Sequence, residues 1–163
     1  MTNMSKTNNS QFQNQLEIEC VKRFLPAYND LNQTSYSAIE KNSIQNEVDI
    51  FVYNELEEVL KIQVSHGDSK HIKDYNISKS IPIKNEEKRS FNRDDKQLIN
   101  NIIERIRIKS NKYGDRAYDL ILLLDDLTGP PQLLFRNFKI SDLKFNFKEI
   151  WLVPQTSDAF RLI

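Results

Sequence analysis

The sequence predicts an α/β fold in which a mixed β-sheet is flanked by helices. Segments at about 47–53 and 58–65 alternate apolar and polar residues, as half-buried strands do. Residues 118–124 form a continuous apolar run, which is typical of a central strand covered on both faces. A helical repeat of apolar residues lies between the strand pair and this run. A helix that joins a hairpin to a later buried strand implies a sheet with both parallel and antiparallel neighbours.

The composition is that of one domain with a hydrophobic core. The chain has 163 residues, of which 39% are hydrophobic and 28% are charged. Residues 1–10 are rich in Asn, Ser and Thr and are predicted to form a disordered tail, so residues 11–163 would form a single domain. The single cysteine, Cys20, excludes an internal disulfide and indicates a reducing compartment. With no secretory segment and no apolar stretch of about 20 residues, we expect a cytoplasmic protein and no membrane partner.

The first predicted helix runs from Gln11 to about Leu25, where apolar residues recur at steps of three and four. Glu17 lies at the edge of its apolar stripe, where it either points toward the sheet or is a solvated helix glutamate. The polar segment from Pro26 to Gln45 is expected to be a connection, with room for a short helical turn near residues 37–41.

The second predicted helix begins after a cap at Ser90 or Asn92 and ends at Gly114, the usual stop residue. Its apolar stripe continues onto Lys109. An ammonium group there must either reach solvent or find an acid.

The other segments give weaker signals. His66 and His71 lie in a long polar stretch, residues 66–92, and we expect solvated side chains. Asp125 and Asp126 follow the buried strand, where a role in a turn is favoured over ligand binding. Residues 132–146 are ambiguous and suit a short packing helix. Strands are expected at 149–153 and 159–163.

The strand pair carries an acid and an amide on one face. Val48, Ile50 and Val52 are expected to point to the opposite face from Asp49, and the second strand repeats this pattern around Gln63. Side chains on the same face of neighbouring strands lie close enough to touch. A carboxylate and an amide oxygen at that point are suitable ligands for one divalent cation. The alternative is a strand-end acid paired with a neighbouring lysine.

Charge is unevenly distributed although the net charge is zero. Residues 1–69 hold 5 basic and 10 acidic residues, whereas residues 70–116 hold 13 basic and 7 acidic residues. A basic middle beside an acidic strand pair suits a phosphate-bearing ligand and a metal ion. The other interpretation is that Lys and Arg decorate a solvated loop and helix.

With these elements placed, the chain resembles the PD-(D/E)XK nuclease superfamily. The resemblance depends on Glu-Val-Asp49-Ile-Phe-Val followed by Leu-Lys-Ile-Gln63-Val-Ser65. It extends through the helix that ends at Tyr113-Gly114 to the late Glu-Ile-Trp151-Leu-Val, and it covers about residues 11–153. It implies a restriction-endonuclease-like fold and metal-dependent hydrolysis of phosphodiester bonds in DNA, with RNA less favoured.

The resemblance also implies roles for individual residues. Asp49, Gln63 and the carbonyl of Val64 would bind Mg²⁺ or Mn²⁺, and Glu17 would join the site from the first helix. The basic loop 70–96 and the following helix would meet the phosphate backbone. Because superfamily members often dimerise to cut both strands, a homodimer is a further expectation.

The sequence departs from the superfamily pattern at Ser65, where the motif expects a lysine. The missing positive charge could come from elsewhere, and Lys109 is the best candidate. Lys61 shares the face of Gln63 but lies two residues in the wrong direction. The remaining interpretation is an inactive nuclease fold that serves as an interaction module for nucleic acid or protein.

Overall fold

The computed structural model describes residues 4–44, 47–66, 93–126, 143–155 and 157–163. The helices and strands of these residues are α1 (Met4–Asn32), β1 (Ala38–Lys41), β2 (Ile50–Tyr53), β3 (Val59–His66), α3 (Arg93–Tyr113), the 3₁₀ helix η1 (Gly114–Asp119), β4 (Ile121–Asp126), β5 (Glu149–Pro154) and β6 (Phe160–Arg161). In these described parts, no helix is long and apolar enough to cross a membrane.

The strands form one six-stranded sheet in the order β1-β2-β3-β4-β5-β6. β1, β2 and β3 are antiparallel neighbours, β3, β4 and β5 are parallel, and β6 is antiparallel to β5. The chain leaves the end of β3 and returns through α3 to start β4 at the same edge as β3, as a parallel pair requires. The prediction of a mixed sheet is therefore confirmed.

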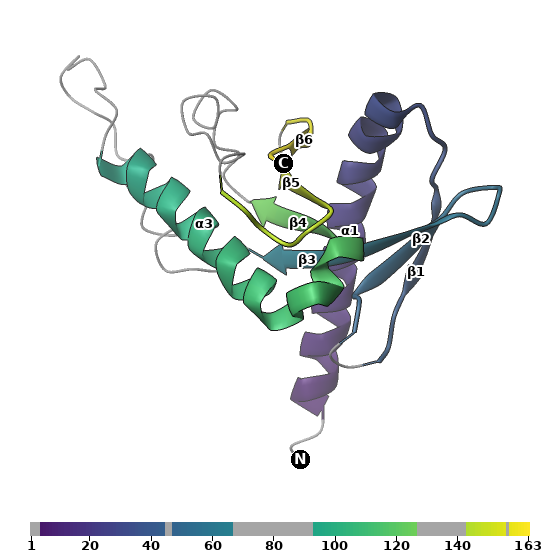
Figure 1. Ribbon diagram of the computed structural model, residues 1–163. Coiled ribbons are helices and arrows are strands. Elements are labelled where there is room, and N and C mark those ends of the chain that lie inside the picture. Colours follow the sequence, from purple (N-terminus) through teal and green to yellow (C-terminus); the bar gives the residue numbers. More distant parts are fainter. Residues whose placement is uncertain (1–3, 45–46, 67–92, 127–142, 156) are drawn as a thin grey trace, which may run out of the picture.

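One long helix covers each face of the sheet (Figure 1). Ile121 and Leu123 of β4 pack in the core cluster that contains α1 residues such as Phe24. Leu122 and Leu124 pack in the second cluster, which contains α3 residues such as Ile102. β4 is thus buried on both faces, as its apolar run predicted, and the fold belongs to the α/β class.

Helix α1 is longer than the sequence predicted. It begins at Met4, within the segment expected to be a tail, and it continues through Pro26 to Asn32. Proline in a helix interior removes one hydrogen bond and costs about 3 kcal/mol. The expected connection after Leu25 is wrong because Tyr28, in the turn after the proline, is buried, and its ring centroid lies 5.9 Å from that of Trp151. This packing offsets the cost of the proline.

Strand β1 replaces the helical turn expected near residues 37–41. Lys41 of β1 pairs with Ile50 of β2, and Ile39 packs against the α1 core cluster. The predicted sheet face of Val48 is also wrong. Val48 packs against the α3 cluster, whereas Ile50 packs on the opposite face of the sheet. The regular alternation fails there because β2 begins only at Ile50.

The C-terminal half agrees more closely with the sequence. α3 ends at Tyr113, and Gly114 adopts a φ of +53°, the left-handed conformation that favours glycine. Strand β4 starts at Ile121 rather than at residue 118 because η1 occupies the preceding residues. β5 lies within a residue of its expected position, whereas β6 spans only two of the five residues expected at 159–163. His71, the expected caps at Ser90 and Asn92 and most of the ambiguous segment 132–146 lie outside the described residues.

Candidate functional site

Asp49 and Gln63 lie opposite each other on neighbouring strands. Ile50 pairs with Ile62, so the next position in this antiparallel register places Asp49 beside Gln63. The carboxylate oxygen Oδ2 of Asp49 accepts a hydrogen bond from the side-chain amide Nε2 of Gln63 and one from the backbone N–H of Val64 at 3.0 Å. The contact that the strand pattern predicted is present.

Gln63 is buried and is held at both ends of its amide. The side chain of this residue, which is 3% exposed, accepts a hydrogen bond at Oε1 from the hydroxyl of Tyr113 at 2.7 Å. Tyr113 is the last residue of α3, so the helix C-terminus closes over this point of β3. The sequence pattern indicated only that Tyr113 lies at the end of the helix. A tyrosine there carries a usable signal, since a buried phenol needs a hydrogen-bonding partner.

Glu17 reaches the same end of the sheet from α1. It is 5% exposed and forms an ion pair with Lys41, the last residue of β1. Lys41 pairs in register with Ile50, the residue after Asp49, so the ion pair lies beside the start of β2. The solvated-helix interpretation of Glu17 is therefore wrong. Sequence reasoning did not find Lys41 because it did not recognise β1.

Four charged side chains near this end of the sheet influence one another's pKa values. They are Asp49, Glu17, Lys41 and Lys109. Burial raises the pKa of Asp49 above its ordinary value, and the charge of Glu17 adds to the effect, while the Val64 N–H, Lys41 and Lys109 oppose it. Burial likewise lowers the pKa of Lys109, against the influence of Asp49 and Glu17. Lys109 is thus partly buried and close enough to both acids for their charges to interact. Asp49 and Gln63 are in contact, and the charges of Glu17 and Lys109 both act on Asp49.

Arg105 supplies a second cation from α3, one helical turn before Lys109. Its guanidinium donates to the backbone oxygen of Ser65 at 2.7 Å and to the Ser65 hydroxyl at 3.2 Å. Ser65 is the position at which the superfamily motif expects a lysine. Sequence reasoning missed Arg105, although its spacing of four from Lys109 places both on one face of the helix.

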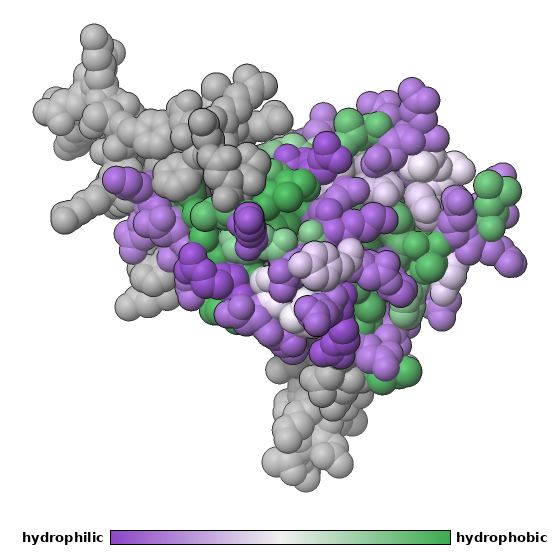
Figure 2. All heavy atoms as spheres, viewed as in Figure 1, coloured by the Kyte–Doolittle hydropathy of each residue, from purple (hydrophilic) through white to green (hydrophobic). Residues whose placement is uncertain are grey.

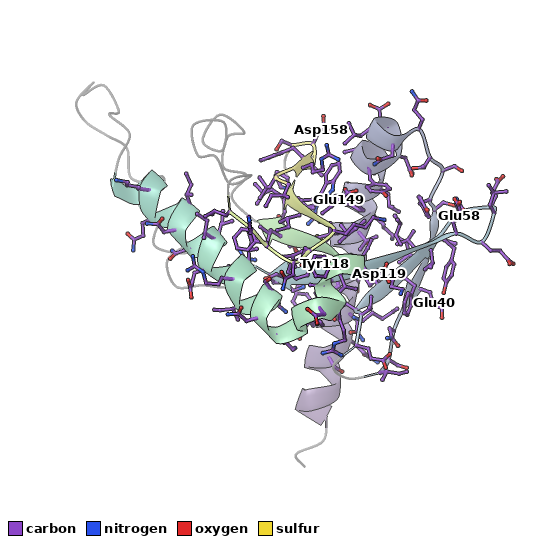
Figure 3. All side chains as sticks on the ribbon, in the orientation of Figure 1. Glu40, Glu58, Tyr118, Asp119, Glu149 and Asp158 are labelled. Atoms are coloured by element: carbon purple, nitrogen blue, oxygen red, sulfur yellow. The ribbon has the colours of Figure 1, made fainter. Side chains whose placement is uncertain are left out.

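Lys61 does not contribute its charge here. It forms an ion pair with Asp119 at the end of η1, whose side chain lies beside the sheet (Figure 3). Lys61 lies two residues before Gln63 along β3. The interpretation that Lys61 replaces the motif lysine is not favoured by this contact.

A second polar cluster holds α1 to the C-terminal ends of β3 and β4. Asp125, which is 5% exposed, accepts from Arg23 at 2.6 Å and contacts Nδ1 of His66 at 3.0 Å. The expected turn at Asp125 and the expected solvated His66 are both wrong. The reason is that β3 and β4 continue to these residues, and the period of two turns both side chains toward α1.

The residues around Asp49 fit a hard divalent cation in part. Mg²⁺ prefers oxygen ligands, and Asp49 supplies a partly buried carboxylate whose pKa is influenced by the charge of Glu17. In the described ranges, no group of three or more His, Cys, Asp or Glu side chains is arranged to hold a metal ion. A cation at Asp49 would therefore need the amide oxygen of Gln63 or a backbone carbonyl such as that of Val64.

Comparisons with known proteins found no matching family model, no matching curated protein and no matching solved structure.

Proposed function

We propose that this protein is a nuclease that hydrolyses phosphodiester bonds in DNA and depends on Mg²⁺ or Mn²⁺. The observation that carries the proposal is the contact between Asp49 and Gln63 on neighbouring strands, beside which Glu17 from one helix and Lys109 from the other act electrostatically on Asp49. The α/β sheet between two helices agrees with the restriction-endonuclease-like fold that the sequence resembles. A cytoplasmic location and a homodimer stay predictions.

Asp49, Glu17, Gln63 and the Val64 carbonyl are the oxygen donors that would hold the cation. When bound, the cation lowers the pKa of a water molecule and neutralises charge that builds on the phosphate. Asp49 is pre-positioned for this role because the Val64 N–H fixes one of its oxygens. The pKa of Asp49 is raised by burial, and cation binding would relieve the cost of keeping it ionised.

The two cations of α3 would stabilise the negative charge of the substrate phosphate. The lowered pKa of Lys109 means that its ammonium gives up a proton more readily than an ordinary lysine does, which suits a proton donor to a leaving oxygen. The Arg105 guanidinium donates to the backbone oxygen and the hydroxyl of Ser65, so it would hold this part of β3 in place and add positive charge beside the phosphate. Lys112, which is exposed on the same side of the helix as Arg105 and Lys109, extends this positive surface for contacts with the phosphate backbone.

The alternative function is an interaction module that has lost catalysis. A specific observation favours it: N–H donors already occupy both acids, since Lys41 pairs with Glu17 and the Gln63 amide donates to Asp49. Such an arrangement is stable without a cation. In that case the basic residues of α3 would bind nucleic acid, or a protein partner would use the fold, without cleavage.

Cleavage of supercoiled plasmid in Mg²⁺ or Mn²⁺ tests the proposal. We expect nicked product from the wild type, a loss of at least about a hundredfold in Asp49→Asn, and a comparable loss in Lys109→Met. Arg107→Met is the matched control, because it removes the same charge from an exposed position on the opposite side of the same helix. An intact plasmid with the wild type, together with salt-dependent DNA binding in a gel-shift assay, would instead support the interaction module.

A further inference from the structure

The side-chain amide of Gln63 is fixed at both ends by groups of different character. Its Nε2 donates to the carboxylate of Asp49, and its Oε1 accepts from the hydroxyl of Tyr113 at 2.7 Å. The hydrogen-bond network defines this orientation, because a carboxylate only accepts and therefore needs the N–H end of the amide. Gln63 and Tyr113 are 3% and 5% exposed, so neither end is bonded to bulk water.

This orientation of the amide stabilises Asp49 when no metal ion is bound, and it is unfavourable when a metal ion is bound. The amide nitrogen carries two N–H groups, which point positive charge at Asp49. A divalent cation at Asp49 needs the amide oxygen, whose lone pairs are here directed at Tyr113. Gln63 must therefore turn its amide by half a revolution before it acts as a ligand.

Tyr113 permits both orientations without losing its own contact. A phenol hydroxyl donates one hydrogen bond and also accepts. When the amide oxygen faces Tyr113, the hydroxyl donates to it, and when the amide nitrogen faces Tyr113, the hydroxyl accepts from it. Because this site is buried, bulk water cannot replace the Tyr113 hydroxyl as a partner. Without that hydroxyl, one end of the Gln63 amide would have no hydrogen bond in either orientation.

We propose that the Gln63 amide reverses when a divalent cation binds Asp49, and that Tyr113 is the positioning residue that bonds it in both orientations. This inference rests on the proposed metal-dependent function. It accounts for glutamine where a carboxylate would supply more charge: a glutamate beside Asp49 would repel it whenever no cation is bound, whereas the amide stabilises both states.

Solution NMR of the wild type, titrated with Mg²⁺, tests the reversal directly. The Gln63 side-chain NH₂ resonances are identified by their absence from the spectrum of Gln63→Glu. We expect these resonances to shift on Mg²⁺ addition and to gain nuclear Overhauser contacts to the Tyr113 ring protons. Unmoved Gln63 resonances in a protein whose Mg²⁺ binding depends on Asp49 would overturn the reversal while leaving the proposed function standing.

Affinity for Mn²⁺, measured by calorimetry, gives an independent test. Gln63→Leu should weaken binding by about tenfold, and Gln63→Glu should strengthen it by at least as much, because it adds ligand charge. Tyr113→Phe leaves one amide end unsatisfied in both orientations, so it should change affinity by less than about threefold while lowering stability. Equal affinity in wild type and Gln63→Leu would overturn the inference. No Mn²⁺ binding by the wild type would overturn the proposed function itself.

Discussion

Asp49→Asn should separate stability from metal binding. The raised pKa of Asp49 shows that its ionised form is more costly in the folded protein than in the unfolded chain. An asparagine oxygen at that position still accepts from the Val64 N–H and from Gln63. The change weakens two charge-assisted bonds by about 1 kcal/mol each and removes a buried charge whose cost is similar. Without metal, we expect the free energy of unfolding to stay within about 1 kcal/mol of the wild type.

The metal-dependent part of the prediction is larger. A ligand at one hundred times its Kd stabilises the folded state by about 2.7 kcal/mol. For a chain of this length, about 1 kcal/mol corresponds to about 2–4 °C in Tm. Wild-type Tm should therefore rise by about 5–11 °C in saturating Mg²⁺ or Mn²⁺, whereas that of Asp49→Asn should not move.

Differential scanning fluorimetry over a cation titration, with a matched chelator control, measures both quantities. K⁺ at equal ionic strength controls for general salt effects. The reasoning is refuted if Asp49→Asn shows the same cation-dependent rise as the wild type. It is also refuted if the variant without metal is several kcal/mol less stable, because Asp49 would then be mainly a structural acceptor.

Three further predictions concern the buried charges. Because the folded pKa of Asp49 lies above its ordinary value of 3.8, wild-type stability without metal should fall as pH rises from about 4 through that folded pKa, and Asp49→Asn should lack this component. Lys41→Met leaves Glu17 buried without its cation, so unfolding in urea should show a loss of about 3 kcal/mol. Arg23→Met leaves Asp125 with only His66, and we expect a loss of about 2 kcal/mol, also measured in urea.

Each of these has its own control. A pH profile that is identical in wild type and Asp49→Asn would contradict the first prediction. In the second, the double change Glu17→Gln with Lys41→Met should recover most of the lost stability, since it removes both charges, and no recovery would argue against an ion pair. In the third, Lys22→Met removes a cation from an exposed pair on the same helix and should cost less than about 0.5 kcal/mol.

The described surface gives few other guides to function. In the view of Figure 2, hydrophilic residues cover most of the described atoms, while hydrophobic residues form one group at the upper left and smaller groups elsewhere. Exposed large hydrophobic side chains such as Phe12 and Leu56 lie on separate elements, α1 and the turn between β2 and β3. Single exposed hydrophobic residues are normal in folded proteins.

The sequence by itself determined the parts of the protein that depend on local pattern. Period-two alternation placed β2 and β3, and the continuous apolar run placed β4. Antiparallel pairing of the first two runs was enough to bring Asp49 and Gln63 together. These features are readable because a strand period and a hairpin register are set by neighbouring residues.

Only the tertiary structure decided which residues from distant parts of the sequence contact one another. Helix α1 continues through Pro26 because Tyr28 packs on Trp151, more than a hundred residues later. Lys41 reaches Glu17 and Tyr113 reaches Gln63 only because β1 and the end of α3 pack at that edge of the sheet. Such contacts depend on how the elements are stacked, and a local sequence pattern carries no information about the partner that burial will supply.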